Sequence, residues 1–412
     1  MKYFVFSFLA LLVLPEPASS LVAQTLTTYL LEDGLLDNNV HSVCKGEGDA
    51  LWFGTQSGVA YFDGTSFTDS VTVEDGLVHE TVFSVLCDAT GDVWMGTDYG
   101  LSRYNGASCI TYTTDEGLED NRVKHLYEDA AGLIWIGHND GVSSFDGSTF
   151  TNYTTSDGLP FGGVAHVTQD LNGDMWFGTG LGGAFRFDGE AFEAFGIAEG
   201  LPNISVRSIA IDAANNKWIG TNEGIVVLGP DNAFMEDHLS LIELPPPHLI
   251  NPVEDVKIDL EGRAWAAVYA EYLVTVGGVG YFNGAEWVAY NEGDGLAGPN
   301  VRQLAVAVNG DLWSATSTGV TRFSGMPASV YEGFSFHSTV FPNPVSDIVT
   351  VELGDLKGSK ASITLYDSRG QIVYRDETFS TTSIQVSHLS RGVYILELLG
   401  KRGASQSQII IE

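Results

Sequence analysis

The chain has few basic residues compared with its acidic ones. It has 412 residues, with 19 Lys and Arg against 53 Asp and Glu, which gives a formal net charge of −34. A surface this acidic repels phosphate backbones and anionic lipid headgroups, so we expect no nucleic-acid partner. Residues 338–412 hold 7 basic and 8 acidic residues, so the remaining residues carry −33. The acidic coat either keeps the protein soluble or attracts cationic partners.

Long apolar runs are also missing, except at the N-terminus. Lys2 precedes an apolar stretch from Phe4 to Leu14, and Pro15 and small residues follow as far as Ala23. This pattern is typical of a secretory signal peptide, and the apolar stretch is too short to span a bilayer. We therefore predict a signal peptide at residues 1–23, with cleavage after Ala23 or Ser20, and no transmembrane segment. No cysteine follows the stretch directly, so we expect no lipoprotein anchor.

Tryptophan recurs at a nearly constant spacing. The seven positions are Trp52, Trp94, Trp135, Trp176, Trp218, Trp265 and Trp313, at intervals of 42, 41, 41, 42, 47 and 48 residues. A period of about 40–50 residues with strand-like contents is typical of a propeller with four strands per blade. We interpret the tryptophans as packing between blades and not as a ligand cage.

Turn signals divide each repeat into four strands. The Asp-x-x-Gly turns (Asp88–Gly91, Asp129–Gly132, Asp170–Gly173) alternate with Asp-Gly or Asn-Gly pairs at Asp63, Asn105, Asp146, Asp188 and Asn283. Both signals favour hairpins, so each repeat should be an antiparallel meander whose faces are buried by its neighbours.

A Gly-Leu pair, followed five residues later by valine, marks the start of each repeat. The glycines are Gly34, Gly76, Gly117, Gly158, Gly200 and Gly295, and the valines are Val40, Val82, Val123, Val164, Val206 and Val301. The valines should open the innermost strands. The marker is missing between Leu228 and Val256, where Pro245–Pro247 indicates an irregular loop, so we expect the outer half of the fifth repeat to be degenerate.

The last repeat contains only three strands before residue 325. Thr25–Leu30 has the pattern of an outer strand and should complete that blade, which would leave no open sheet edge. The prediction is an all-β chain: a seven-bladed β-propeller at residues 24–325, a linker at 326–339, and a small Ig-like β-sandwich at 340–412.

Cysteine is scarce, with Cys44, Cys87 and Cys109 only. An odd number leaves at least one thiol unpaired. Cys87 and Cys109 fall in the first and last strands of one repeat, about 14 Å apart and too distant to bridge. We expect three buried thiols, and no cysteine spacing suggests a metal site.

The repeat resembles the two-component regulator propeller repeat. The matching segments are Leu51–Gly58, Val93–Gly100, Ile134–Gly141 (with His138 for Thr), Met175–Gly182 and Lys217–Gly224, while the sixth and seventh copies lose Gly-Thr. The resemblance covers about residues 25–325 and implies glycans as candidate ligands, because such repeats commonly form glycan-responsive sensor domains. No kinase or DNA-binding region follows in this sequence, so we do not expect signalling by phosphotransfer.

The C-terminal residues resemble the type A sorting domain of the type IX (Por) secretion system of Bacteroidetes. The motif is Pro342-Asn343-Pro344, followed by Leu365-Tyr366-Asp367 and Gly392-Val393-Tyr394. Ile363 and Leu365 alternate on one strand face, and Val393 and Ile395 on another, as in a small sandwich. The resemblance implies the type IX machinery as partner, translocation across the outer membrane, and removal of the domain. An ordinary Ig-like binding module is the alternative.

Candidate ligand-binding residues lie in loops that share one face of the predicted propeller. They are Asp98, Tyr99, Arg122, His138, Asn139, Asp140, Asn222, Glu223, Tyr269 and Tyr272, with Asn39 and Asn300 also at the channel mouth. Polar and aromatic side chains on a rigid scaffold suit binding. Tyr269, Glu271 and Tyr272 belong to an insertion in the sixth repeat, which is either a sugar-binding element or merely a tolerated loop.

Catalysis has no clear motif in this sequence. Carboxylates are abundant enough for glycoside chemistry, but most occupy turn positions, and there is no nucleophile elbow. Asp170–Asp174 is similar to part of a calcium loop and also serves as a hairpin turn. We predict a secreted or cell-surface, non-catalytic scaffold without cofactor or metal, binding a polysaccharide or a protein. The alternative is a propeller-fold polysaccharide lyase or glycoside hydrolase.

The sorting prediction can be tested on the mature protein. If the C-terminal domain is removed after export, peptide mass spectrometry of cell-surface material should find no peptides from beyond about residue 340. Retention of those peptides in the surface fraction would contradict it.

Overall fold

A computed structural model describes residues 25–160, 162–243, 250–271, 275–325, 339–341, 345–352, 361–366, 372–378, 382–387, 389–400 and 403–411. The chain divides into two compact units, residues 1–327 and 328–412. The predicted signal peptide and nearly all of the predicted linker lie outside the described residues.

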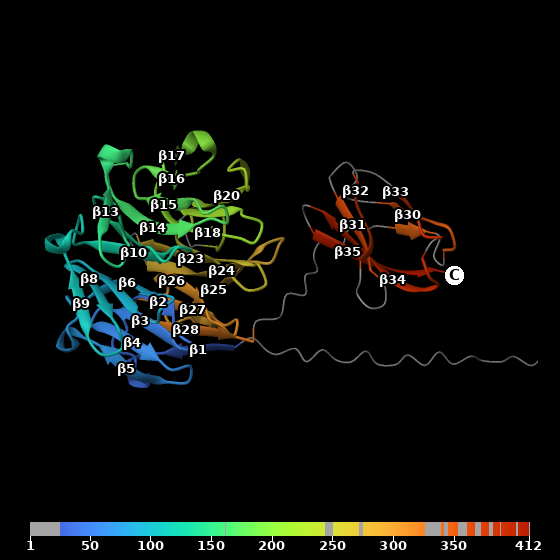
Figure 1. Ribbon diagram of the computed structural model, residues 1–412. Coiled ribbons are helices and arrows are strands. Elements are labelled where there is room, and N and C mark those ends of the chain that lie inside the picture. Colours follow the sequence, from blue (N-terminus) through green and yellow to red (C-terminus); the bar gives the residue numbers. More distant parts are fainter. Residues whose placement is uncertain are drawn as a thin grey trace, which may run out of the picture. The chain divides into compact units, whose positions relative to one another are not determined.

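The first unit contains seven four-stranded antiparallel sheets arranged as the blades of a propeller (Figure 1). The innermost strands are β2 (Val40–Lys45), β6 (Val82–Cys87), β10 (Val123–Glu128), β14 (Val164–Gln169), β18 (Val206–Ile211), β22 (Val253–Ile258) and β26 (Val301–Val306). The second strands are β3 (Leu51–Thr55), β7 (Val93–Thr97), β11 (Ile134–His138), β15 (Met175–Thr179), β19 (Lys217–Thr221), β23 (Ala264–Glu271) and β27 (Leu312–Thr316). The seven-bladed propeller is thereby confirmed.

The outer half of each blade consists of a third strand and an outer strand. The third strands are β4 (Gly58–Phe62), β8 (Gly100–Tyr104), β12 (Gly141–Phe145), β16 (Gly183–Phe187), β20 (Gly224–Leu228), β24 (Thr275–Phe282) and β28 (Gly319–Ser324). The outer strands are β5 (Phe67–Val71), β9 (Cys109–Tyr112), β13 (Phe150–Tyr153), β17 (Phe192–Phe195), β21 (Phe234–His238), β25 (Trp287–Tyr290) and β1 (Thr25–Tyr29).

The ring closes as predicted, because β1 pairs with β28 from Thr25↔Ser324 to Tyr29↔Val320. The predicted degeneracy of the fifth blade is wrong. Strand β21 is present and pairs with β20 through one register shift. An outer strand needs mainly backbone pairing and tolerates exposed side chains such as Phe234 and Met235, so its sequence pattern is weak.

Short 3-10 helices explain the Gly-Leu marker. They are η1 (Leu31–Asp33), η2 (Val73–Asp75), η3 (Thr114–Glu116), η4 (Thr155–Asp157), η5 (Ile197–Glu199) and η6 (Glu292–Asp294). Each ends at a left-handed glycine, such as Gly76 at φ 96°, a conformation that disfavours residues with a Cβ. The leucine that follows, such as Leu77, is buried between blades.

Most of the repeated tryptophans are buried between blades, as expected. In five blades the indole N–H donates to the aspartate six residues earlier, as Trp94 does to Asp88 at 2.8 Å and Trp265 to Asp259 at 2.8 Å. The aspartate side chain also accepts backbone N–H groups of its own turn. One carboxylate therefore fixes both the hairpin and the buried ring, which satisfies a polar atom inside the core.

The glycine of the Gly-Thr pair lets neighbouring blades approach closely. A Cβ built on Gly96 would lie 2.4 Å from Val123 Cγ1, and one on Gly137 would lie 2.8 Å from the Val164 carbonyl oxygen. Val123 and Val164 open the innermost strands of the next blades. Glycine is therefore required here for packing between blades.

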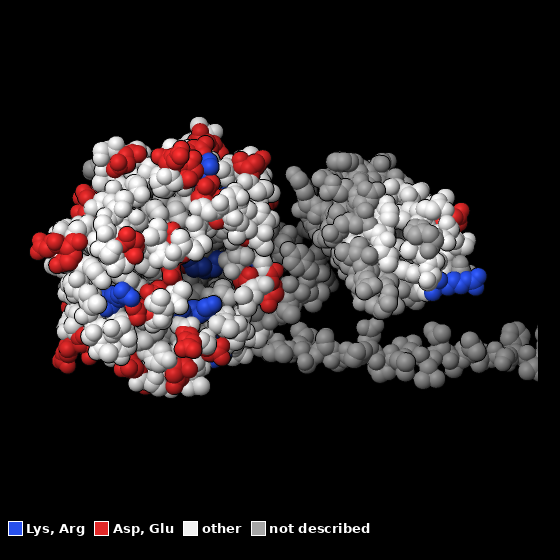
Figure 2. All heavy atoms as spheres, viewed as in Figure 1, with Lys and Arg blue, Asp and Glu red and all other residues white. Residues whose placement is uncertain are grey.

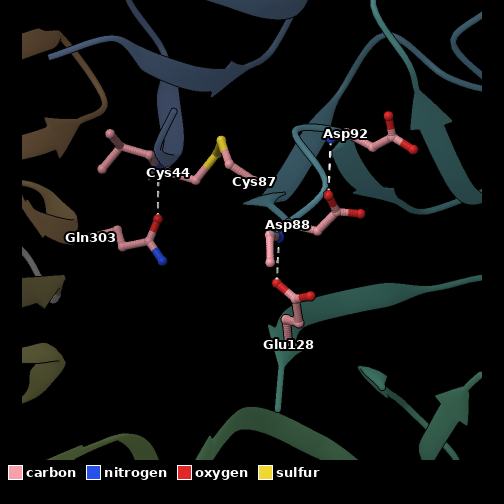
Figure 3. The surroundings of a disulfide bond; sticks show 8 residues. Cys44, Cys87, Asp88, Asp92, Glu128 and Gln303 are labelled. Carbon is pink, nitrogen blue, oxygen red and sulfur yellow. Dashed lines mark hydrogen bonds between the residues drawn. A yellow bond between two sulfur atoms is a disulfide. The ribbon is translucent and has the colours of Figure 1, made fainter. Parts of the chain in front are cut away.

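The expectation of three free thiols is wrong, because Cys44 and Cys87 form a disulfide (Figure 3). They lie on the innermost strands β2 and β6 of adjacent blades, with Cα atoms 5.8 Å apart. Innermost strands of neighbouring blades lie closer together than the first and last strands of one blade, which brings these two cysteines within bonding distance. Cys109 is a free, half-buried thiol.

The second unit is a two-sheet β-sandwich. One sheet contains β29 (Thr339–Phe341), β30 (Ile348–Glu352) and β33 (Thr382–Gln385). The other contains β32 (Ile372–Thr378), β31 (Ala361–Tyr366), β34 (Gly392–Gly400) and β35 (Gly403–Ile411), in that order.

The sandwich core corrects one predicted strand phase. Ile363 and Leu365 are fully buried, as the alternation predicted. On β34, however, Tyr394 and Leu396 enter the core, which is the opposite phase to the predicted pair Val393 and Ile395. The aromatic ring of Tyr394 fills the core while its hydroxyl donates to the Ser390 carbonyl at 2.7 Å.

Close packing between blades predicts a specific loss of stability. Gly96→Ala should lower the free energy of unfolding by about 1–3 kcal/mol, because the new methyl group overlaps Val123. Gly180→Ala is the matched control, since a Cβ there meets no atom within 4 Å, and it should change stability by less than about 0.5 kcal/mol. Urea unfolding measures both, and equal effects would refute the packing role of Gly96.

Candidate functional site

Every innermost strand contains a β-bulge directly after its first valine. The pairing register with the second strand shifts at Val40/Ser42, Val82/Ser84, Val123/His125, Val164/His166, Val206/Ser208, Val253/Asp255 and Val301/Gln303. The residues left out of the ladder, here called the bulge residues, are His41, Phe83, Lys124, Ala165, Arg207, Glu254 and Arg302. A bulge releases one residue from pairing and redirects its side chain.

The bulge residues converge on one cavity, here called the channel-mouth cavity. It has a volume of about 530 Å³ and is lined by His41, Phe83, Arg122, Val123, Lys124, Arg207, Glu254, Tyr269, Asn300 and Arg302. Six of these are bulge residues. A second cavity of about 340 Å³ shares these six and adds residues such as His125, His166, Asp255 and Gln303. Figure 2 shows Lys and Arg atoms at the hollow in the middle of the propeller.

In five of the seven blades, the residue after the bulge links its blade to the next one. Its side chain accepts the backbone N–H two residues beyond the next bulge residue. The pairs are Ser84 with Leu126 at 3.1 Å, His125 with Val167 at 3.2 Å, Ser208 with Val256 at 2.9 Å, Asp255 with Leu304 at 2.9 Å, and Gln303 with Val43 at 2.7 Å. These bonds hold neighbouring bulges at fixed positions, so the cavity wall is rigid.

Basic side chains dominate the cavity. Arg207 donates to both carboxylate oxygens of Glu254, at 2.5 and 2.7 Å. Arg302 donates to Asn39 Oδ1 at 2.7 Å and lies 2.7 Å from His41 Nδ1. Burial and the charge of Arg302 lower the pKa of His41 to about 4, so this imidazole is neutral at pH 7. Burial, followed by the charge of Arg122, also lowers the pKa of Lys124.

Several predicted ligand-binding residues lie in the lining of the channel-mouth cavity or pair with a lining residue. Arg122, Tyr269 and Asn300 line the cavity, and Asp98 pairs with Arg122 at 2.8 Å. Tyr99 is 60% exposed and stacks on His79, with ring centroids 4.5 Å apart.

The remaining predicted residues are not part of the cavity lining. Asn139 and Asp140 form the turn between β11 and β12, where Asp140 is exposed. Asn222 and Glu223 form the equivalent turn of the fifth blade, where Glu223 accepts from Asn203 at 3.0 Å. None of these four lines the cavity. Tyr272 falls outside the described residues.

His138 was a wrong choice for a surface ligand contact. It occupies the position of the repeat threonine, is fully buried, and its Nε2 lies 2.9 Å from Ser143 Oγ. Burial lowers its pKa to about 4. In other blades the threonine at this position caps the hairpin, as Thr97 does by donating to the Gly100 carbonyl at 2.9 Å, whereas the His138 ring contacts Ser143 instead.

Sequence reasoning missed the basic bulge residues Lys124, Arg207 and Arg302. A usable signal was present, because each directly follows a strand-opening valine. In an ordinary strand this residue would simply alternate with its neighbours, and only the repeated bulge turns six such positions toward the channel-mouth cavity.

Metal binding has no candidate group in the described part of the chain, where no three His, Cys, Asp or Glu side chains come together suitably. Within that same part, no helix is long and apolar enough to cross a membrane. Of the predicted sorting residues, Gly392 opens β34 at φ 158° and Tyr394 is buried, while Pro342, Asn343 and Pro344 fall outside the described residues.

Two family models match the chain. Residues 117–140 match the two component regulator propeller, and residues 339–412 match the secretion system C-terminal sorting domain. Both resemblances are thereby confirmed. The sorting domain marks the protein for export to the cell surface by the type IX system. No curated protein matches the chain significantly in sequence.

Solved structures share the fold at low sequence identity. The extracellular domain of a proposed hybrid two-component system of B. thetaiotaomicron has a TM-score of 0.63 at 19% identity, covering 94% of this chain and 57% of that one. PorZ, a surface component of the type IX secretion system of Porphyromonas gingivalis, has 0.57 at 17%, covering 92% and 60%. This chain thus spans less than two thirds of either. Virginiamycin B lyase of Staphylococcus aureus has 0.57 at 12%, covering 73% and 99%.

The buried histidines predict a loss of stability in mild acid. Burial, and then the charge of Lys257, lowers the pKa of His125 to about 3, and burial and His125 lower that of His166 well below 6.5. Between pH 6.5 and about 4 the unfolded chain binds protons that the folded chain does not. The free energy of unfolding therefore decreases as the pH is lowered through this range. The slope is at most about 1.4 kcal/mol per histidine per pH unit.

The double substitution His125→Ser/His166→Ser should flatten this dependence, since serine occupies the same position in blades one, two and five. Urea unfolding at pH 7, 6, 5 and 4.5 compares the two proteins. Parallel curves would show that these histidines do not cause the loss.

Proposed function

We propose that this chain, a propeller with a C-terminal sorting domain, is a non-catalytic recognition scaffold that acts outside the cell and binds a polysaccharide at the channel-mouth cavity. The observation that carries this proposal is the convergence of six bulge residues on one polar cavity. Rigid backbone with different side chains at equivalent positions is what selective binding requires.

The size and lining of the cavity favour a sugar over a protein as the ligand. A volume of about 530 Å³ suits a small ligand or the end of a chain. A protein partner would need about 800 Å² of complementary surface on each side. The exposed ring of Tyr99, held by His79, and the rings of Phe83 and Tyr269 offer flat faces for sugar rings.

Non-catalytic binding is supported by the absence of a recognisable reaction centre among the described residues. The carboxylate that lines the cavity, Glu254, accepts two hydrogen bonds from Arg207. Two hydrogen bonds from one guanidinium occupy both oxygens of this carboxylate. Likeness to a lyase at 12% identity supports the fold alone.

A glycan array combined with a turnover assay tests the proposal. The full chain should retain polysaccharides without releasing reducing ends or unsaturated products. Product release would show a lyase or glycoside hydrolase. Absence of any glycan binding would refute the ligand class.

Tyr99→Ala should weaken glycan binding about tenfold, because it removes an exposed aromatic face next to Asp98, the partner of the lining residue Arg122. Ile110→Ala is the matched control: Ile110 is 46% exposed but lies on the outer strand β9. Equal effects of the two substitutions would place the ligand elsewhere.

A further inference from the structure

Most basic residues of the propeller pair with aspartates, and most of the others line a single cavity. Residues 25–325 contain only eleven Lys and Arg. Five pair with aspartates of the blade hairpins: Arg103 with Asp92, Arg186 with Asp174, Lys217 with Asp170, Arg263 with Asp259 and Arg322 with Asp311. Lys257 pairs with Asp255, and Lys45 is exposed at the end of β2. The remaining four, Arg122, Lys124, Arg207 and Arg302, all line the channel-mouth cavity.

The cavity is therefore positive inside an acidic protein. Its lining holds four basic residues and one carboxylate, Glu254, which gives +3. Counting Asp98, which pairs with Arg122, gives +2. By contrast, residues 1–337 carry −33 in total.

Lys124 carries the clearest unmet charge. Within the part of the chain that the structure describes, its ammonium group has neither an ion pair nor a hydrogen bond. Burial, and then the neighbouring Arg122, lower its pKa, and the smaller opposite effects of Asp120 and Asp140 do not cancel this. Placing like charges together lowers stability, and such a cost is typical of functional sites.

The surrounding charge restricts what can enter. A long polyanion would lie over the acidic periphery and be repelled within a Debye length of about 8 Å. A ligand with its negative charge confined to one end group could place that group in the cavity and leave its neutral part at the rim. Charge-assisted hydrogen bonds from Lys and Arg would then hold it.

We infer that the channel-mouth cavity binds an anionic end group, a carboxylate or a sulfate, of an otherwise neutral glycan, with Lys124, Arg207 and Arg302 as its donors. This inference rests on the proposed function for the glycan, whereas the anion site rests on the cavity alone.

The anion site is tested first with small probes on the full chain. Isothermal titration at constant ionic strength should show binding of glucuronate and of sulfate, with a Kd on the order of 1 mM, and none of glucose. Lys124→Gln should weaken binding about tenfold, because one charged donor is lost, and Lys124→Glu should abolish it. Lys45→Gln, at the other end of an innermost strand, should bind as the unmodified chain does.

Stability separates a binding role from a structural one. Lys124→Gln should unfold at the same or a higher urea concentration, since it relieves repulsion from Arg122. Loss of binding together with a lower unfolding midpoint, or equal binding by the Lys124 and Lys45 variants, would overturn the assignment. Binding of glucuronate but not sulfate would identify a carboxylate as the end group, and the reverse would identify a sulfate.

The glycan array separates the two proposals. Signals confined to glycans with an acidic end group, and lost in Lys124→Gln, support both. Equal binding of neutral counterparts overturns the anion site and leaves the recognition role standing. Binding of the small probes without any glycan signal would support the anion site and refute a glycan as the ligand. Failure of both measurements refutes both.

Discussion

The structure depends on one residue in each innermost strand that the sheet does not pair. Val40 and Ser42 are paired with β3, but His41 between them is not, and the same holds in all seven blades. The unpaired residue is freed from the alternation that buries its neighbours between blades. Its side chain can therefore vary between blades without changing the packing of the core.

Close packing between blades makes these seven positions equivalent. Gly96 admits Val123 of the next blade to a distance that no Cβ would allow, and Ser84 accepts the Leu126 amide across the same boundary. Each bulge is thus fixed relative to its neighbour. The resulting wall carries six kinds of side chain at seven positions, from Ala165 to Arg302, on one repeated backbone. Within one innermost strand, the paired residues therefore stabilise the fold, while the bulge residue is available to contact a ligand.

Much of the fold was predictable because its signals are local and repeated. The tryptophan period gave the blade number, and Gly34, Gly76 and their equivalents marked the connectors, where a left-handed residue is required.

Strand β21 was missed because an exposed outer strand needs no apolar pattern. The Cys44–Cys87 disulfide was missed because it joins adjacent blades. The bulge residues were missed because a register shift is a property of paired strands and is not written in either strand alone. Arg122 and Asn300 were found because they adjoin a recognisable marker.

A crystal structure of the full chain grown with glucuronate tests the anion site most directly. We expect the carboxylate in the channel-mouth cavity, within hydrogen-bonding distance of Lys124 Nζ and of the Arg207 or Arg302 guanidinium. An ordered glucuronate at another surface, or a channel-mouth cavity without it at saturating concentration, would refute an anion site in this cavity.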